Sequence, residues 1–150
     1  MEIGDFKRLT QTIKNKIFLM VGRAILAAVN NTDSTQMVQL ELLDGEVVTD
    51  IERMQEYGFE TFPEPGAEAV PLFVNGNRDQ GVVLVIHDRR YRPTTLKEGE
   101  VMIYTKWKDI GAGHDVQLLE GRKIVINADE ITINADTQLT INCPSVDFNP

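Results

Sequence analysis

Three observations in the sequence predict an all-β protein that begins with a short amphipathic helix. Apolar residues recur every three or four positions over residues 3–17, which is the helical period. Five strand-length apolar segments, separated by turns rich in Gly and Asn, follow within residues 18–95. The last third repeats itself: Ile-Asn-Ala-Asp at 126–129 returns at 133–136 and, altered to Ile-Asn-Cys-Pro, at 141–144.

The charge balance restricts the function classes. Twenty-three acidic and fifteen basic residues give a formal net charge of −8. Broad binding to nucleic acid or to anionic membranes needs a basic surface, so this balance argues against both. Three chains in a closed trimer would carry −24, three times the charge of one chain, which favours solubility.

Cysteine use and hydropathy bear on the compartment. The single cysteine, Cys143, excludes an intrachain disulfide framework, and its apolar repeat position predicts a small buried side chain. The start, Met-Glu-Ile-Gly-Asp, has no apolar stretch of the kind found in secretory signal peptides. No window approaches eighteen consecutive apolar residues, so no transmembrane helix is predicted. We expect a soluble protein that is made in a cytoplasm.

The N-terminal segment, residues 1–17, is predicted to be a helix with one apolar face and several basic side chains. Two interpretations are open: the helix packs on its own domain, or it docks on a partner or a sister chain. In the second case the docking residues are Ile3, Phe6, Leu9 and Ile13.

Residues 18–95 predict a small barrel. The hairpin signal Asp44-Gly45 joins two of its strands, and no interior segment has a clear helical period. Five short strands of this kind are typical of a five-stranded Greek-key barrel of the OB type, with a small sandwich as the alternative. The predicted strands cover residues 18–29, 36–43, 46–54, 69–74 and 82–87.

The third domain, residues 96–150, follows a hinge at 92–99 that contains a Pro and a Gly. Its repeat strands are too short to bury an apolar face within one chain, and their edges would be open to aggregation. Three chains wound about one axis remove both problems and predict an intertwined triple-stranded β-helix; a single-chain solenoid is the competing model. The residues predicted to line the trimer axis are Ile124, Ile126, Ile131, Ile133, Leu139, Ile141, Val146 and Phe148.

The sequence contains no motif that points to catalysis. It lacks a phosphate-binding Gly-rich loop, a nucleophile elbow and a His-Glu-x-x-His motif, and the histidines His87 and His114 are far apart. We therefore predict no catalytic, cofactor-binding or metal-binding residues. One basic-aromatic cluster, residues 89–92, leaves open an OB-fold module that binds an oligonucleotide or oligosaccharide and uses the β repeat only to oligomerise.

Five ordered motifs in the middle of the chain resemble the signature of the Mu-type phage baseplate assembly protein V family, the central tail spikes of contractile-tailed phages. The resemblance covers about residues 20–119. The motifs are Tyr-Gly-Phe at 57–59, Pro-Gly-Ala-Glu-Ala-Val at 65–70, Gly-Asn-Arg-Asp-Gln-Gly-Val-Val at 76–83, Asp-Arg-Arg-Tyr-Arg-Pro at 88–93 and Gly-Glu-Val-Met-Ile-Tyr at 99–104.

The resemblance implies a homotrimer in the virion, with an N-terminal part that docks on the baseplate hub protein, an OB-fold domain and a C-terminal β-helical needle. It implies that sheath contraction drives the needle through the host outer membrane, without catalysis. A cell-wall hydrolase carried on the tail is a further alternative, which no catalytic constellation supports.

The C-terminus departs from the family pattern. Family needles often end in a His-x-His motif that binds iron, whereas this sequence has no histidine after His114. We therefore predict no histidine-bound iron. Three explanations of the missing motif are open: a separate protein caps the tip, the apex packs in a different way, or the segment ends early relative to a longer needle.

Overall fold

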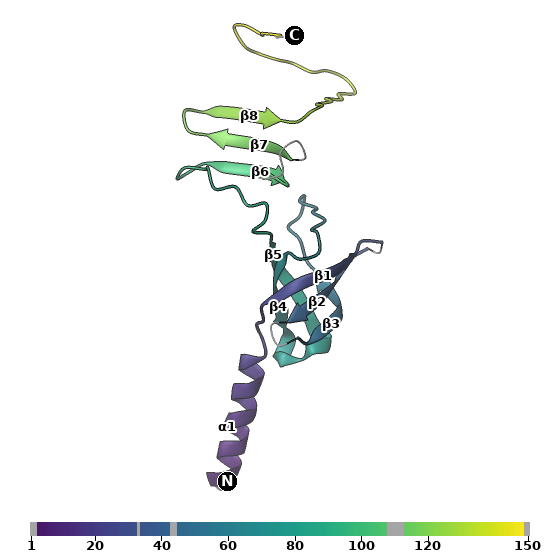
Figure 1. Cartoon of the computed structure of the whole chain (residues 1–150), viewed down its shortest axis with the longest axis vertical. Helices are drawn as coiled ribbons and strands as arrows, with labels where there is room; N and C mark the ends of the chain where they lie inside the picture. Colours follow the sequence, from purple (N-terminus) through teal and green to yellow (C-terminus); the bar gives the residue numbers. More distant parts are fainter. Residues whose placement is uncertain (1–2, 33, 43–44, 108–112, 149–150) are drawn as a thin grey trace. The chain divides into compact units, whose positions relative to one another are not determined.

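The computed structural model describes residues 3–32, 34–42, 45–107 and 113–148. The chain divides into two compact units, Met1–Arg92 and Pro93–Pro150. Residues 93–95, which the sequence analysis assigned to the barrel domain, belong to the second unit. Figure 1 shows a helix and a barrel in the first unit, and a three-stranded sheet followed by an extended segment in the second.

The N-terminal helix α1 spans Ile3–Phe18. Its close contacts with the barrel are at its C-terminal end: Arg78 Nη1 donates to the Leu19 carbonyl at 3.2 Å, and Gly76 packs on the Lys16 carbonyl. A Cβ at Gly76 would lie 2.7 Å from that oxygen, and φ there is +71°, so glycine is required. The predicted docking side chain Ile13 is half exposed, whereas those of Ile3, Phe6 and Leu9 lie outside the described residues.

One strand prediction was wrong at its start. The apolar run 18–29 was predicted to be a single strand, but α1 ends at Phe18 and strand β1 begins only at Ala24. The helical hydrogen bond from the Leu19 N–H to the Asn15 carbonyl, 3.1 Å, extends the last turn into this run. Local hydrogen bonding therefore overrode the apolar pattern.

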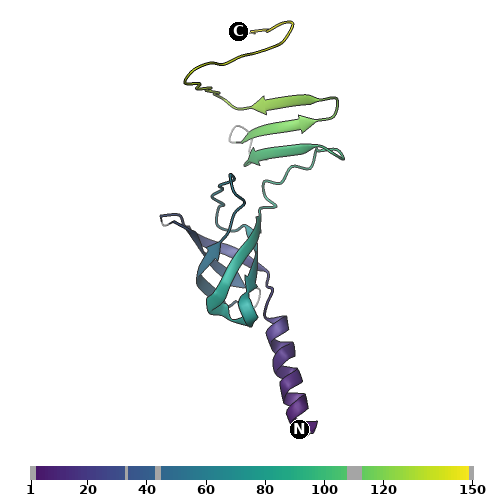
Figure 2. The same ribbon diagram turned by 180° about the vertical axis from the view of Figure 1, so that it is seen from behind.

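The five-stranded barrel prediction is confirmed. The barrel closes in the order β1-β2-β3-β5-β4, with β3 and β5 parallel and the other neighbours antiparallel, and this order is that of an OB-like barrel (Figure 2). Its strands are β1 Ala24–Asn30, β2 Gln36–Leu42, β3 Val47–Arg53, β4 Glu68–Phe73 and β5 Gly81–His87. Two 3₁₀ turns, η1 Val74–Gly76 and η2 Arg78–Gln80, connect β4 to β5. Of the predicted turn between β2 and β3, Asp44 lies outside the described residues, and Gly45 has φ +82°.

The barrel interior is filled by the alternate residues of its own strands. Phe73 is completely buried, and Gly81 gives its ring space: a Cβ there would lie 2.8 Å from Ile51 Cδ1 and 3.0 Å from the Phe73 ring. Pro71 lies where the β4–β5 register shifts, the kind of strand position that tolerates a missing N–H. The buried apolar core consists of Ala24, Leu26, Val38, Leu40, Leu42, Val48, Ile51, Ala67, Ala69, Phe73 and Val83.

The second unit contains an antiparallel sheet of three strands, β6 Val101–Thr105, β7 His114–Leu119 and β8 Lys123–Asn127, in that order. Residues 128–148 are extended but join no ladder in the single chain. Strands were predicted here around residues 131–133, 139–141 and 146–148. None of the described helical segments is long and apolar enough to cross a membrane.

Candidate functional site

One face of the β6-β7-β8 sheet is entirely aliphatic at its centre. Residues paired across antiparallel strands lie on the same face of a sheet. The register therefore aligns two rows of three side chains on one face: Val101, Leu118 and Ile124 form the first, and Ile103, Val116 and Ile126 form the second. Five of the six are exposed and Val116 is half-buried, so the described residues of the chain leave this aliphatic face largely uncovered.

The opposite face of the sheet is polar around a buried carboxylate. Asp115, 9% exposed, pairs in register with Tyr104 and Asn127. Its Oδ1 accepts hydrogen bonds from Gln117 Nε2 at 2.7 Å and Asn127 Nδ2 at 2.8 Å. The polar face thus satisfies its own hydrogen bonds within one chain, whereas the aliphatic face is left uncovered.

The aliphatic character continues along the repeat segment, which we define as residues 123–148. All eight predicted axis residues are more than half exposed in the single chain, from 51% at Val146 to 90% at Phe148. Within residues 128–148, all of which the structure describes, the backbone groups form no hydrogen bonds with one another. Cys143, predicted to be buried, is also exposed in the single chain.

The free energy available at this surface is large. Fully burying a Val, Leu, Ile or Phe side chain contributes about 1.5–3 kcal/mol. Single exposed apolar residues are normal on a protein surface. Eight of them within one short segment are not, and such a concentration indicates an interaction surface. The aliphatic face and repeat segment together form the candidate functional surface.

Sequence reasoning missed part of this surface. The structure adds four residues to the predicted pair Ile124 and Ile126: Val101, Ile103, Val116 and Leu118. The alternation in Val-Met-Ile-Tyr-Thr at 101–105 carried the signal, since its first and third residues share a face. What the alternation did not reveal was which strands pair and in which register.

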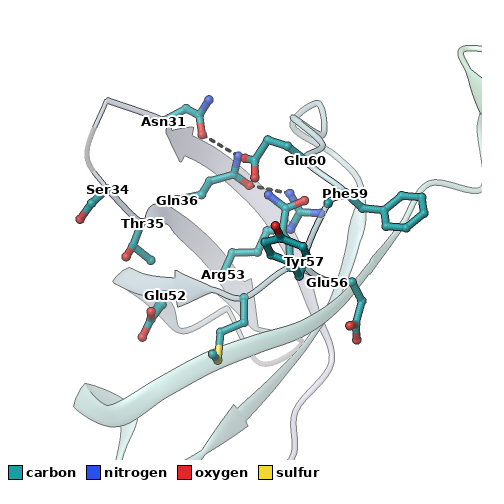
Figure 3. A pocket seen from close by; sticks show the side chains of 13 residues that line it. Asn31, Ser34, Thr35, Gln36, Glu52, Arg53, Glu56, Tyr57, Phe59 and Glu60 are labelled. Atoms are coloured by element: carbon teal, nitrogen blue, oxygen red, sulfur yellow. Dashed lines mark hydrogen bonds between the residues drawn. The ribbon is translucent and has the colours of Figure 1, made fainter.

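A second feature is a hollow of about 750 Å³ at one end of the barrel, beside the loop of residues 54–62 (Figure 3). Arg53 holds this loop in place: its Nη1 donates to the Thr61 carbonyl at 2.7 Å and to Gln36 Oε1 at 2.6 Å, and its Nη2 donates to Thr61 Oγ1 at 2.6 Å. Burial lowers the pKa of Arg53, against the opposing charge of Glu60. Thr61 is further bound by Gln55 Oε1, 2.9 Å from its N–H.

The loop carries exposed aromatic side chains but no catalytic arrangement. In Figure 3 the labelled Tyr57 and Phe59 lie on the loop, and both are well over half exposed. The acidic residues Glu52, Glu56 and Glu60 line the same hollow, so its charge disfavours a phosphate backbone.

The basic cluster at residues 89–92 is occupied by local carboxylates. Arg90 Nη2 pairs with Asp88 Oδ2 at 2.6 Å and also donates to the Pro65 carbonyl at 2.9 Å. Arg89 Nε lies 2.9 Å from Glu68 Oε1. The hydrogen bonds from Arg90 lower the pKa of Asp88. These partners favour a structural role for the cluster over binding of oligonucleotide phosphates.

The histidines do not form a site together. His87 ends β5 in the first unit, and His114 begins β7 in the second, where its Nδ1 lies 2.8 Å from Thr105 Oγ1. Among the described residues there is no group of three His, Cys, Asp or Glu side chains arranged to hold a metal ion. The prediction that no iron is bound concerns an assembled apex and stays a prediction.

The chain is similar to gp45 proteins of phage Mu and of a Mu-like prophage. Residues 23–90 match the family described as "Bacteriophage Mu Gp45, N-terminal". The chain is 36% identical to the "Baseplate puncturing device gp45" of Escherichia phage Mu, over 94% of this chain and 69% of that protein. It is 32% identical to the "Mu-like prophage FluMu protein gp45" of Haemophilus influenzae, over 94% of this chain and 78% of that protein.

Proposed function

The chain belongs to the bacteriophage Mu Gp45 family, and we propose on that premise that it is the central spike of a contractile phage or phage-like tail baseplate. In this role it is a structural component of the virion and not an enzyme. The name of the phage Mu relative, a baseplate puncturing device, supports the assignment.

The observation that carries the proposal is the uncovered aliphatic surface of the second unit. Three copies of the chain, with their aliphatic faces turned to a common axis, would bury Ile103, Val116 and Ile126 and the axis residues of the repeat segment. The unpaired backbone of residues 128–148 would at the same time pair with neighbouring chains. A homotrimer with a triple-stranded β-helix satisfies both requirements.

The proposed mechanism is mechanical. Strands that share backbone hydrogen bonds across three chains have no free edge, so local unfolding of one chain is opposed by its two neighbours. Such a rod resists compression when sheath contraction drives the tail tube against the host. The rod then penetrates the outer membrane without forming or breaking covalent bonds.

The proposed partners follow from this role. The baseplate hub protein contacts the trimer at its N-terminal side, and the host outer membrane is contacted transiently. The protein reaches the virion by assembly in the cytoplasm of the host bacterium.

Light scattering on the purified full chain tests the trimer. We expect a mass three times that of the 16.9 kDa chain at neutral pH. A monomer at micromolar concentration would contradict the proposal. Its place in the particle is tested by antibody labelling of intact tails in the electron microscope, where signal away from the baseplate end would refute a spike.

A further inference from the structure

Two apolar side chains in the second half of helix α1 are exposed to solvent. Ile13 and Ile17 are 50% and 60% exposed, and the close contacts of the helix with the barrel lie at its C-terminal end. We propose that the α1 helices of three chains pack on one another as a parallel three-stranded coiled coil. This inference rests on the proposed trimer. It assigns the apolar stripe of α1, the side that carries Ile13 and Ile17, to contact with the other two chains of the trimer instead of with a hub protein.

The spacing of the stripe fits a heptad repeat. Ile3, Phe6, Thr10, Ile13 and Ile17 are separated by three, four, three and four positions, as are successive a and d positions of a coiled coil, and four of the five are apolar. Ile17 occupies an a position and Ile13 a d position. Isoleucine at both a and d shifts the preference from two strands to three or four, and here it occupies two of the three a positions and one of the two d positions.

The polar side of α1 needs no partner. Gln11 Nε2 donates to Asn15 Oδ1 at 2.9 Å, and Thr12 Oγ1 donates to the Arg8 carbonyl at 2.9 Å. In the proposed register these residues occupy the b, c and f positions, which point away from the seam. Polar side chains on one side of the helix therefore have hydrogen-bond partners within the helix, whereas Ile13 and Ile17 on the other side face solvent.

The flanking lysines select the parallel orientation. Lys7 and Lys14 occupy e positions, and Lys16 occupies a g position. In a parallel coiled coil each g position faces the e position five residues later in a neighbour, so Leu9 opposes Lys14. Lys16 meets no e position, because α1 ends at Phe18, and no lysine of α1 faces another lysine. An antiparallel arrangement would place the e-position lysines of two chains against each other. Parallel packing is also what a three-fold axis requires.

The length of α1 explains why the coiled coil would depend on the rest of the trimer. A helix of sixteen residues is marginal alone in water. Linkage to chains that are already associated raises the effective concentration of the helices to the order of millimolar. The repeat segment would thus supply the association, and the helices would add a second contact at the N-terminal end.

Disulfide trapping in the full chain tests the proposal. In a Cys143→Ser background, Ile13→Cys places a thiol at the seam, and Asn15→Cys places one at the outermost f position of the same helix. After mild oxidation we expect Ile13→Cys to link two chains of each trimer on a non-reducing gel, whereas Asn15→Cys remains unlinked. Light scattering before oxidation establishes the mass of each variant.

The outcomes separate this inference from the proposed function. A monomer by light scattering would overturn the trimer and with it the coiled coil. A trimer in which Ile13→Cys and Asn15→Cys link equally, or not at all, would overturn the coiled coil alone and return the apolar stripe to a hub partner. Selective linkage at Ile13 in a trimer supports both.

Discussion

In the barrel, Leu26, Leu40 and Val83 are at most 1% exposed, whereas Ile126, Ile133 and their counterparts in the repeat segment are more than half exposed. Both regions place aliphatic residues on alternate positions of strands. The barrel strands close on themselves, so the inward positions meet within one chain. The repeat segment has no such closure, so its apolar side chains stay exposed in the single chain. The same local pattern therefore builds a core within one chain in the first unit, whereas in the second unit it gives the surface that we propose to be buried between chains.

The largest effect is expected from a charge on the proposed axis. Ile133→Asp would place three carboxylates at one level of the trimer, and burying an unpaired ion costs several kcal/mol. We expect the trimer to dissociate, as seen by light scattering, while the barrel stays folded. Thr132→Asp, at the alternate position, is the matched control and should remain trimeric. If both variants stay trimeric, the axis is assigned to the wrong positions.

A core truncation in the barrel should act differently. Phe73→Ala removes a completely buried ring, and such truncations cost about 3–5 kcal/mol. We expect a lower urea midpoint for the barrel that does not change with protein concentration, in contrast to the repeat segment. Val74→Ala, at a neighbouring exposed residue, should shift the free energy of unfolding by no more than about 0.5 kcal/mol. A midpoint that depends strongly on concentration would show that the barrel too requires assembly.

A smaller, local effect is expected at the barrel-end loop. Arg53→Ala removes the donor of Gln36 Oε1 and leaves the Thr61 carbonyl with only the 3.2 Å hydrogen bond from Gln36 Nε2, at a cost of about 1–3 kcal/mol. Amide exchange in residues 54–62 should accelerate while the trimer mass is unchanged. The exposed neighbour Glu56→Ala should leave exchange unaltered. Uniform acceleration over the whole barrel would instead indicate a global role for Arg53.

The smallest expected effect is a loss of stability at acidic pH, to which one carboxyl group in each unit contributes. Hydrogen bonds from Arg90 lower the pKa of Asp88 in the barrel, and the backbone N–H groups of Lys97 and Glu120 lower that of Glu100 in the second unit. A carboxyl group whose pKa is lower in the folded than in the unfolded state stabilises the folded protein at pH values above its ordinary pKa. This stabilisation is lost as the pH falls through the lowered pKa. Asp88→Asn and Glu100→Gln should therefore each flatten the acid side of a plot of melting temperature against pH. Unchanged acid profiles in both variants would refute the linkage.

Much of the architecture was predictable because it depends on local pattern. Alternation and turn residues indicated five barrel strands, and the spacing of Ile3 to Ile17 indicated a helix. The start of β1 was mispredicted because an apolar run alone does not distinguish the last turn of a helix from a strand. The candidate surface was half predicted: the axis residues of β8 were named, but their neighbours on β6 and β7 were not.

The order of the residues alone determined where apolar side chains recur. It also indicated that the short repeats of the last third cannot bury their apolar side chains within one chain. Periodicity is a local property, and it is readable without coordinates. Closure of the barrel through the parallel β3–β5 pair, and the register that joins Val101, Leu118 and Ile124 in one row, were settled only in three dimensions. Pairing depends on contacts between residues distant in sequence, and alternation within each strand is compatible with several such pairings.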